Sequence, residues 1–358
     1  MNERANSLAG IMTPAVLIDL DKVERNIKRL QDYADQHGLK VRPHIKTHKL
    51  PQIAAMQLKA GAVGVTCQKV SEAEAMVAAT PEIRDVLITY NIIGAEKLDR
   101  LAALAKKVDL SVVADNETVI DGLRKRFVSE AKPLPVFVEC NTGANRCGIA
   151  TPEEAAILAE AVAKSPGLTF AGLMTYPPPN GTANVQAFMV RAKALLEAKN
   201  IPVPAVTSGG TPSMMMAGEA PVTTEYRAGT YVYNDRSLVE RGACGWDDCA
   251  LTVLATVVSV PADNRAIIDA GSKTLTSDLL GLVGYGHVLN RPDISIDQLS
   301  EEHGRLSTLG PINLRVGDLI RIVPNHACVV TNMVDKVQVI TGGHVLGAWH
   351  VCARGCIT

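Results

Sequence analysis

Three short segments of the sequence combine residue types that can do chemistry. The densest is Arg42-Pro43-His44-Ile45-Lys46-Thr47-His48-Lys49, which holds three Lys or Arg side chains and two histidines. Neighbouring cations favour the neutral amine of a lysine, which is the form that makes a Schiff base with a carbonyl compound. Lys46 is therefore a candidate Schiff-base lysine. A solvated basic loop that binds an anion is the alternative.

Two glycine-containing segments have the composition of a phosphate site. They are Ser208-Gly209-Gly210-Thr211 and Arg227-Ala228-Gly229-Thr230, and each follows a predicted strand. Small residues leave backbone N–H groups open to an anion, and paired loops of this kind favour phosphate. For either loop alone, a tight turn without a ligand is the alternative.

The third segment is His326-Ala327-Cys328, which lies in a region that we expect to be β-strand. In a strand, side chains at positions i and i+2 point to the same side, so an imidazole and a thiolate can converge on one cation. Two protein ligands leave positions for water and substrate, as in a catalytic metal site. A chance pair is the alternative, and the other cysteines lack paired Cys-x-x-Cys spacing.

Composition argues against several classes of protein. The 358 residues include 36 Lys+Arg and 37 Asp+Glu, a net charge of −1, and only 4% aromatic residues, so we expect no binding to nucleic acid. No run reaches the roughly 18 apolar residues of a membrane helix. The N-terminal segment lacks the apolar stretch of a secretory signal. We therefore expect a cytoplasmic protein that does not bind membranes and keeps its eight cysteines reduced.

The elements that must position these residues alternate between β-branched runs and Ala-, Leu- and Lys-rich helical segments. Eight runs recur about every 20 to 35 residues. They are apolar throughout, as in parallel strands buried on both faces. Such units close into a (β/α)8 TIM-type barrel, whereas the rival doubly wound sheet lacks its Gly-x-Gly-x-x-Gly fingerprint here. The predicted strands are Val41–His44, Ala62–Cys67, Asp85–Tyr90, Leu110–Ala114, Pro135–Cys140, Thr169–Thr175, Ala205–Thr207 and Thr223–Tyr226.

Barrel active sites lie at the carboxyl ends of the strands. Polar and glycine residues recur at these predicted ends, although loops are polar in general. They are His44, Lys46, His48, Gln68, Tyr90, Asn91, Asp115, Asn141, Thr142, Tyr176, Ser208, Gly209, Gly210 and Arg227.

After about residue 245 the helical pattern gives way to alternating or β-branched runs, which predict a C-terminal antiparallel β domain. The segment Thr13–Leu20 is expected to pair with it. We predict a barrel domain over residues 21–240 and a β domain formed by residues 1–20 and 241–358. The predicted strands of the β domain are Ala250–Val260, Arg265–Ile268, Asn313–Val323, Ala327–Met333 and Lys336–Ile340.

Four motifs in this order resemble a known group of enzymes. They are Arg-Pro-His-Ile-Lys-Thr-His-Lys, Asn-Arg-Cys-Gly, Ser-Gly-Gly-Thr-Pro and Pro-Asn-His-Ala-Cys. The chain resembles the D-threonine aldolase/D-serine dehydratase group of pyridoxal 5'-phosphate (PLP) enzymes, which share the alanine-racemase-type barrel. The resemblance implies PLP, a divalent metal (Zn, Mn or Mg), a small β-hydroxy-D-amino acid as substrate, and a homodimer.

The resemblance also implies where the cofactor is held. Lys46 would bond covalently to PLP, Arg146 would lie beside its phenolate, and Tyr176 would lie against its pyridine ring. Residues from two loops would cradle the phosphate, and two strand-end residues are also expected at the cofactor. The loop residues are Ser208, Gly209, Gly210, Gly229 and Thr230, and the strand-end residues are His44 and Arg227.

His326 and Cys328 would, by the same resemblance, bind the metal near the substrate's β-hydroxyl, and His48 is the candidate base at that hydroxyl. The aldolases of the group resemble one another in carrying His-x-Asp, whereas the D-serine dehydratases carry His-x-Cys. Cys328 therefore favours a dehydratase, or an aldolase with zinc in place of a harder ion. The C-terminal segment 349–355 is more similar to that of the aldolases.

The predicted function is a retro-aldol lyase that releases glycine and an aldehyde. A D-serine or D-threo-3-hydroxyaspartate dehydratase, which would release a 2-oxo acid and ammonia, is the main alternative. An amino-acid racemase and a non-catalytic PLP-binding protein are further alternatives.

Overall fold

The computed structural model describes residues 8–358, which divide into two compact units. The barrel unit comprises residues 28–46, 51–229 and 356–358. The β unit comprises the described residues up to 27 together with 47–50 and 230–355. The predicted domain limits at 20/21 and 240/241 stay a prediction, and residues 1–7 lie outside the described residues.

Eight parallel strands form the sheet of the barrel unit, in the order β2-β9-β8-β7-β6-β5-β4-β3. The sheet curls until its two edges approach, where His44 bridges Thr66 and the Thr66 N–H donates to the Pro43 carbonyl over 2.8 Å. The barrel prediction is confirmed, and all eight predicted strands are present. They are β2 (Lys40–Val41), β3 (Val65–Cys67), β4 (Asp85–Ile88), β5 (Asp109–Ala114), β6 (Leu134–Cys140), β7 (Leu168–Thr175), β8 (Val206–Gly209) and β9 (Glu225–Arg227).

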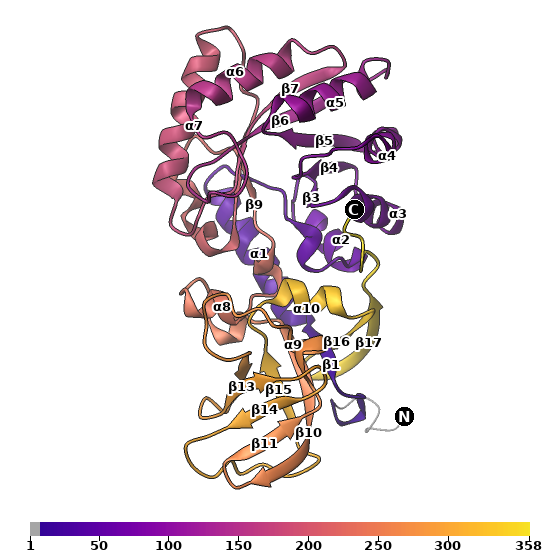
Figure 1. Cartoon of the computed structure of the whole chain (residues 1–358), viewed down its shortest axis with the longest axis vertical. Coiled ribbons are helices and arrows are strands. Elements are labelled where there is room, and N and C mark those ends of the chain that lie inside the picture. Colours follow the sequence, from indigo (N-terminus) through magenta and orange to yellow (C-terminus); the bar gives the residue numbers. More distant parts are fainter. Residues whose placement is uncertain (1–7) are drawn as a thin grey trace. The chain divides into compact units, whose positions relative to one another are not determined.

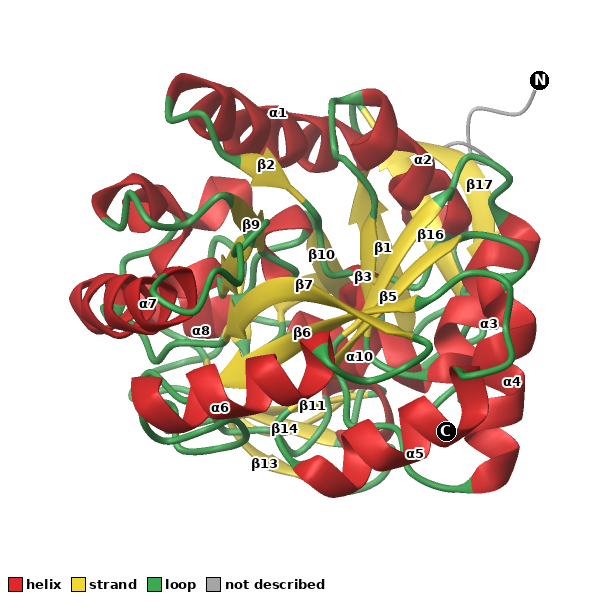
Figure 2. Ribbon diagram, turned by 90° about the horizontal axis from the view of Figure 1, so that it is seen from above, coloured by secondary structure: helices red, strands yellow, loops and turns green. Residues whose placement is uncertain are grey.

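Helices α3 to α7 lie outside this sheet (Figures 1 and 2). The start of α6 follows its sequence signals: the Thr151 hydroxyl accepts the Glu154 N–H over 3.2 Å, and Pro152 occupies the first turn. No helix among residues 8–358 is long and apolar enough to cross a membrane. The helices are α1 (Leu20–Gln36, of which Lys28 onward belongs to this unit), α2 (Pro51–Lys59), α3 (Val70–Ala79), α4 (Ala95–Ala105), α5 (Glu117–Phe127), α6 (Pro152–Ala163) and α7 (Thr182–Glu197).

Arg42 ties three strands of the barrel unit together. It follows β2, and its guanidinium donates to Glu225 of β9 over 2.8 Å and to Asp85 of β4 over 2.6 Å. The arginine is only 9% exposed and the Glu225 side chain is 7% exposed, so their ion pair lies largely out of water, whereas the Asp85 side chain is 40% exposed. Gly64 makes this approach possible, because a Cβ there would lie 2.5 Å from the guanidinium.

Nine strands form the sheet of the β unit, and most of their pairings are antiparallel. Strand β1 pairs with β10 antiparallel and with β16 in parallel, so the expected pairing of segment Thr13–Leu20 with this region is confirmed. The strands are β1 (Ala15–Asp19), β10 (Leu251–Ala262), β11 (Arg265–Ile268), β12 (His287–Val288), β13 (Ser295–Leu299), β14 (Gly304–Ser307), β15 (Leu319–Val323), β16 (Lys336–Thr341) and β17 (His344–His350).

The predicted strand Ala327–Met333 is wrong, because this segment is helix α10. Its β-branched residues suggested a strand. The Asp235 carboxylate, however, accepts the Ala327 N–H over 3.1 Å and fixes the first turn of a helix. The Thr331 hydroxyl donates to the Ala327 carbonyl within that helix. Two shorter helices, α8 (Arg236–Glu240) and α9 (Ser272–Leu275), also belong to the β unit.

The predicted strand Asn313–Val323 is correct only for its second half, Leu319–Val323. The first half turns, with Asn313 at φ 50° and Gly317 at φ 94°. Both values lie in the left-handed region, which interrupts a strand.

We predict that Arg42→Met lowers the free energy of unfolding by about 3–5 kcal/mol, because it leaves the Glu225 carboxylate buried without its cation. Urea unfolding of the full chain measures this. The control is Lys28→Met, whose exposed pair with Asp32 (73% and 51% exposed side chains) has a small effect, below about 1 kcal/mol. Equal losses in the two variants would contradict the prediction.

Candidate functional site in the barrel unit and a ligand pair in the β unit

Lys46 and His44 follow strand β2 and meet at Gln68, the residue after β3. The Gln68 Nε2 donates to the Thr89 carbonyl over 2.9 Å, which fixes the orientation of the amide. Its Oε1 accepts from the Lys46 Nζ over 3.2 Å and lies 3.0 Å from the His44 Nε2. Because an amide oxygen only accepts, the neutral His44 ring carries its hydrogen on Nε2.

His44 is held in its neutral form. Burial lowers the pKa of this histidine well below its ordinary value, and the charges of Lys46, Arg227 and Arg146 lower it further. Its Nδ1 is buried and has no hydrogen-bond partner among residues 8–358. A buried lone pair of this kind fits a ligand that donates a hydrogen bond.

Arg227 ends strand β9 and is 5% exposed. Its Nε donates to the Thr207 hydroxyl over 2.9 Å and its Nη2 donates to the Thr175 carbonyl over 2.6 Å. Burial lowers the pKa of this guanidinium to about 10, so it stays protonated at neutral pH. Cationic side chains at the carboxyl ends of the strands suit an anionic ligand.

Arg146 and Tyr176 lie together in the loops after β6 and β7. The guanidinium lies over the tyrosine ring, 4.5 Å from its centroid. The glycine turn after β8 passes the same ring, because a Cβ on Gly210 would lie 3.6 Å from it. Gly210 has φ 128°, which a residue with a Cβ rarely adopts, and its N–H donates to the Arg227 carbonyl over 3.3 Å.

His326 and Cys328 lie close together at the start of α10 in the β unit, and each shifts the pKa of the other. Burial opposes the charged ring, yet the bonds to Cys328 and Asp278 raise the pKa of His326 to about 9. Burial likewise opposes the thiolate, yet His326 lowers the pKa of Cys328. The Thr47 and Thr230 hydroxyls lie 3.2 Å and 3.4 Å from the Cys328 Sγ, so Thr230, predicted at the phosphate, contacts this thiol.

The proximity of His326 and Cys328 does not come from a strand. His326 precedes α10 in an extended conformation and Cys328 lies in the first helical turn. The expected alternation of the two side chains along a strand is therefore wrong, and their role as metal ligands stays a prediction.

His48 is buried in the β unit. Its Nδ1 accepts the Leu50 N–H over 3.0 Å, and its ring meets the Tyr233 ring edge-on. The neutral ring consequently carries its hydrogen on Nε2, which is a donor rather than the acceptor that a base requires. The predicted role of His48 as a base stays a prediction.

The two units thus divide the predicted site residues between them. Gln68 and Asp278 contact predicted site residues, but the sequence alone suggested no role for either. Gln68 was recognisable as a strand-end residue, whereas Asp278 lies 48 positions before His326 in a segment without a periodic pattern. The barrel unit holds Lys46, His44, Arg146, Tyr176, Ser208, Gly209, Gly210, Arg227 and Gly229, and the β unit holds His48, Thr230, His326 and Cys328.

The side chains present fit both predicted groups. The barrel unit offers an amine and buried cationic charge, which suit a phosphorylated aldehyde. In the β unit, the imidazole of His326 lowers the pKa of the Cys328 thiol, and a nitrogen and sulfur donor pair of this kind suits zinc. Among residues 8–358, no three His, Cys, Asp or Glu side chains gather to hold a metal.

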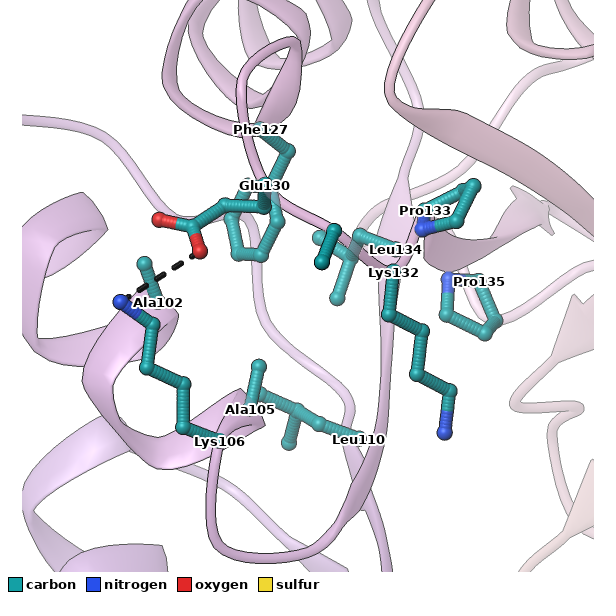
Figure 3. Close-up of a pocket in the computed structure, with 11 residues that line it drawn as sticks. Ala102, Ala105, Lys106, Leu110, Phe127, Glu130, Lys132, Pro133, Leu134 and Pro135 are labelled. Atoms are coloured by element: carbon teal, nitrogen blue, oxygen red, sulfur yellow. Dashed lines mark ion pairs between the residues drawn. The ribbon is translucent and has the colours of Figure 1, made fainter.

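A cavity of about 380 Å³ opens at the amino ends of β5 and β6 (Figure 3). Leu110 and Leu134 line it together with Phe127, and Lys106 forms a 3.4 Å ion pair with Glu130 there. In barrels of this type the chemistry lies at the carboxyl ends of the strands, so this cavity is separate from the candidate site.

Two family models match the chain. The model described as the N-terminal domain of alanine racemase matches residues 18–237, which is more than half of the chain. The model described as a putative serine dehydratase domain matches residues 250–340.

Relatives of known activity match nearly the whole chain. It is 34% identical to a D-threonine aldolase from Arthrobacter sp, over 97% of this chain and 94% of that protein. The D-threonine aldolase from Filomicrobium marinum is 35% identical with a TM-score of 0.91, covering 99% and 98% of the two chains. The D-threo-3-hydroxyaspartate dehydratase from Delftia sp. HT23 is 29% identical with a TM-score of 0.87, covering 96% and 99%. The resemblance to the D-threonine aldolase/D-serine dehydratase group is confirmed.

Two solved structures are of variants of a D-threo-3-hydroxyaspartate dehydratase. One carries a histidine-to-alanine substitution, and the other carries a cysteine-to-alanine substitution two positions further along and is a metal-free form.

We predict that His44→Gln reduces the acid sensitivity of the fold. The pKa of His44 is depressed in the folded chain, so below about pH 6.5 the unfolded chain takes up a proton that the folded chain does not. Stability therefore falls as pH falls, by up to about 1.4 kcal/mol per pH unit for this group. Urea unfolding of the full chain between pH 5 and 7.5 measures the slope. His344→Gln, at an exposed position, is the control, and identical slopes for all three proteins would refute the prediction.

Proposed function

This chain belongs to the family of the alanine racemase N-terminal domain, and on that premise we propose that it is a PLP- and metal-dependent lyase that cleaves β-hydroxy-D-amino acids to glycine and an aldehyde. The observation that carries the proposal is the Lys46 amine, which Gln68 holds beside His44 at the carboxyl ends of the barrel strands, near the buried Arg227 and the exposed Arg146. The similarity to two D-threonine aldolases supports the direction of the reaction.

Several predicted site residues of the barrel unit have a role in this proposal. When bound, PLP supplies an electron sink for the pair released at the substrate's α-carbon. Lys46 would hold the cofactor covalently and move a proton at its Nζ, which Gln68 orients. Arg227 and Arg146 would balance negative charge, and the Tyr176 ring would pack against an aromatic ligand.

His326 and Cys328 would hold the divalent metal, which would act as a Lewis acid on the substrate's β-hydroxyl oxygen. The histidine and cysteine substituted in the Delftia dehydratase have the same spacing as this pair. A thiolate ligand prefers zinc to magnesium, so we propose zinc, with manganese and magnesium as alternatives. A homodimer and a cytoplasmic location stay predictions.

One observation favours a second activity. Cys328 is the ligand type that the resemblance associates with dehydratases, and the Delftia relative is a D-threo-3-hydroxyaspartate dehydratase. The second candidate is therefore dehydration of a β-hydroxy-D-amino acid to a 2-oxo acid and ammonia.

We predict that the wild-type chain reconstituted with PLP is yellow and that Lys46→Ala loses this colour on dialysis, because the amine that bonds the cofactor is gone. Absorbance before and after borohydride reduction measures the covalent link. The control is Lys40→Ala, which removes an exposed lysine at the start of β2 and keeps the colour. A colourless wild type would contradict the cofactor assignment.

We predict that D-threonine yields acetaldehyde and glycine in equal amounts. Chromatographic product analysis at early times distinguishes the two lyases. Production of 2-oxobutanoate and ammonia instead would reject the aldolase and establish the second candidate.

A further inference from the structure

The His326 ring is held on one side by a carboxylate. Its Nδ1 lies 2.8 Å from the Asp278 Oδ2. An ionised carboxylate only accepts hydrogen bonds, so the Nδ1 carries a hydrogen and donates it. The Nε2 is then the only nitrogen of the neutral ring with a free lone pair.

Asp278 is itself fixed in position. The Asn325 Nδ2 donates to the Asp278 carbonyl over 3.0 Å and to the Gly284 carbonyl over 2.8 Å. The Asn325 Oδ1 accepts from Arg236 over 3.3 Å, and Asn325 is 1% exposed. The residue directly before His326 therefore anchors the segment that carries Asp278, and the carboxylate and the ring are parts of one hydrogen-bonded assembly.

A second carboxylate, that of Asp235, lies near His326 and Cys328 and has a different structural role. Asp235 is fully buried and accepts from the Ser237 hydroxyl and from the Leu238 and Ala327 N–H groups. These donors belong to helix starts, so Asp235 fixes where α10 begins. Asp278 contacts the imidazole itself and fixes which nitrogen is free.

We propose that Asp278 is a positioning residue for the metal pair: its carboxylate holds His326 as the tautomer whose Nε2 lone pair is directed to a cation shared with Cys328. This inference rests on the metal-binding part of the proposed function. Carboxylates that orient a ligating histidine typically contribute roughly 10- to 100-fold to metal affinity. Asp278 is not assigned as a third ligand, because its Oδ2 is engaged by the His326 Nδ1.

The test is zinc binding by the full chain, measured by competition with a chromophoric chelator at one fixed pH. We expect Asp278→Ala to weaken zinc binding roughly 10- to 100-fold. We expect Asp278→Asn to recover much of the loss, because its amide oxygen still accepts from Nδ1. The Asp278 side chain is 43% exposed, so the urea midpoint of Asp278→Ala should match that of the wild type. Asp297→Ala removes another partly exposed carboxylate of the β unit and serves as the matched control.

Cobalt spectra separate positioning from ligation. If Asp278 only orients the ring, cobalt-saturated Asp278→Ala has the same thiolate-to-cobalt absorption band as the wild type. A changed band at saturation would make Asp278 a ligand and overturn the inference. Unchanged zinc affinity in Asp278→Ala, with binding lost in His326→Ala, would also overturn it while leaving the metal site intact. Zinc binding unaffected by His326→Ala would instead reject the proposed metal site itself.

Discussion

The barrel unit depends on the two ion pairs of the buried Arg42. The two edges of an eight-stranded sheet must meet for a barrel to close, and backbone contact there includes one isolated bridge at His44 and the hydrogen bonds from the Val63 and Thr66 N–H groups to the Val41 and Pro43 carbonyls. Arg42 supplies side-chain contacts to Glu225 and Asp85 at this seam. Since His44 and Lys46 follow it by two and four residues, the same contacts fix where the candidate lysine lies. The contacts that close the sheet therefore also determine the position of the Lys46 amine.

The electrostatics of the candidate site depend on burial as much as on charge. The net charge of the chain is −1, yet Arg227 and Lys46 lie at neighbouring strand ends with Arg146. A further protonated histidine among these cations would be costly, and burial keeps His44 neutral instead. Gln68 satisfies His44 and Lys46 with one oxygen, so the region holds a concentrated positive charge without a charged histidine. This arrangement suits a phosphorylated cofactor.

In the β unit, the carboxylates of Asp235 and Asp278 fix the positions of His326 and Cys328. Asp235 determines where α10 starts and thereby brings Cys328 into the same turn as His326. Asp278 determines how the imidazole is oriented. Asp235 and Asp278 are both distant in sequence from His326 and Cys328. The positions of the two side chains in this short motif therefore depend on residues elsewhere in the chain.

Apolar runs buried on both faces, regular spacing and the Thr151 cap are local patterns, and for that reason the sequence alone predicted the barrel strands within three residues of their ends. The residue types of Lys46, His326 and Cys328 likewise indicated the roles that are proposed for them. The segment Ala327–Met333 was mistaken for a strand because its helix depends on a hydrogen bond to Asp235, 92 positions earlier. Tertiary structure also decided the ring orientation of His326 and the tautomer of His44. Each depends on one hydrogen bond between residues that the sequence separates, and no local pattern records such a bond.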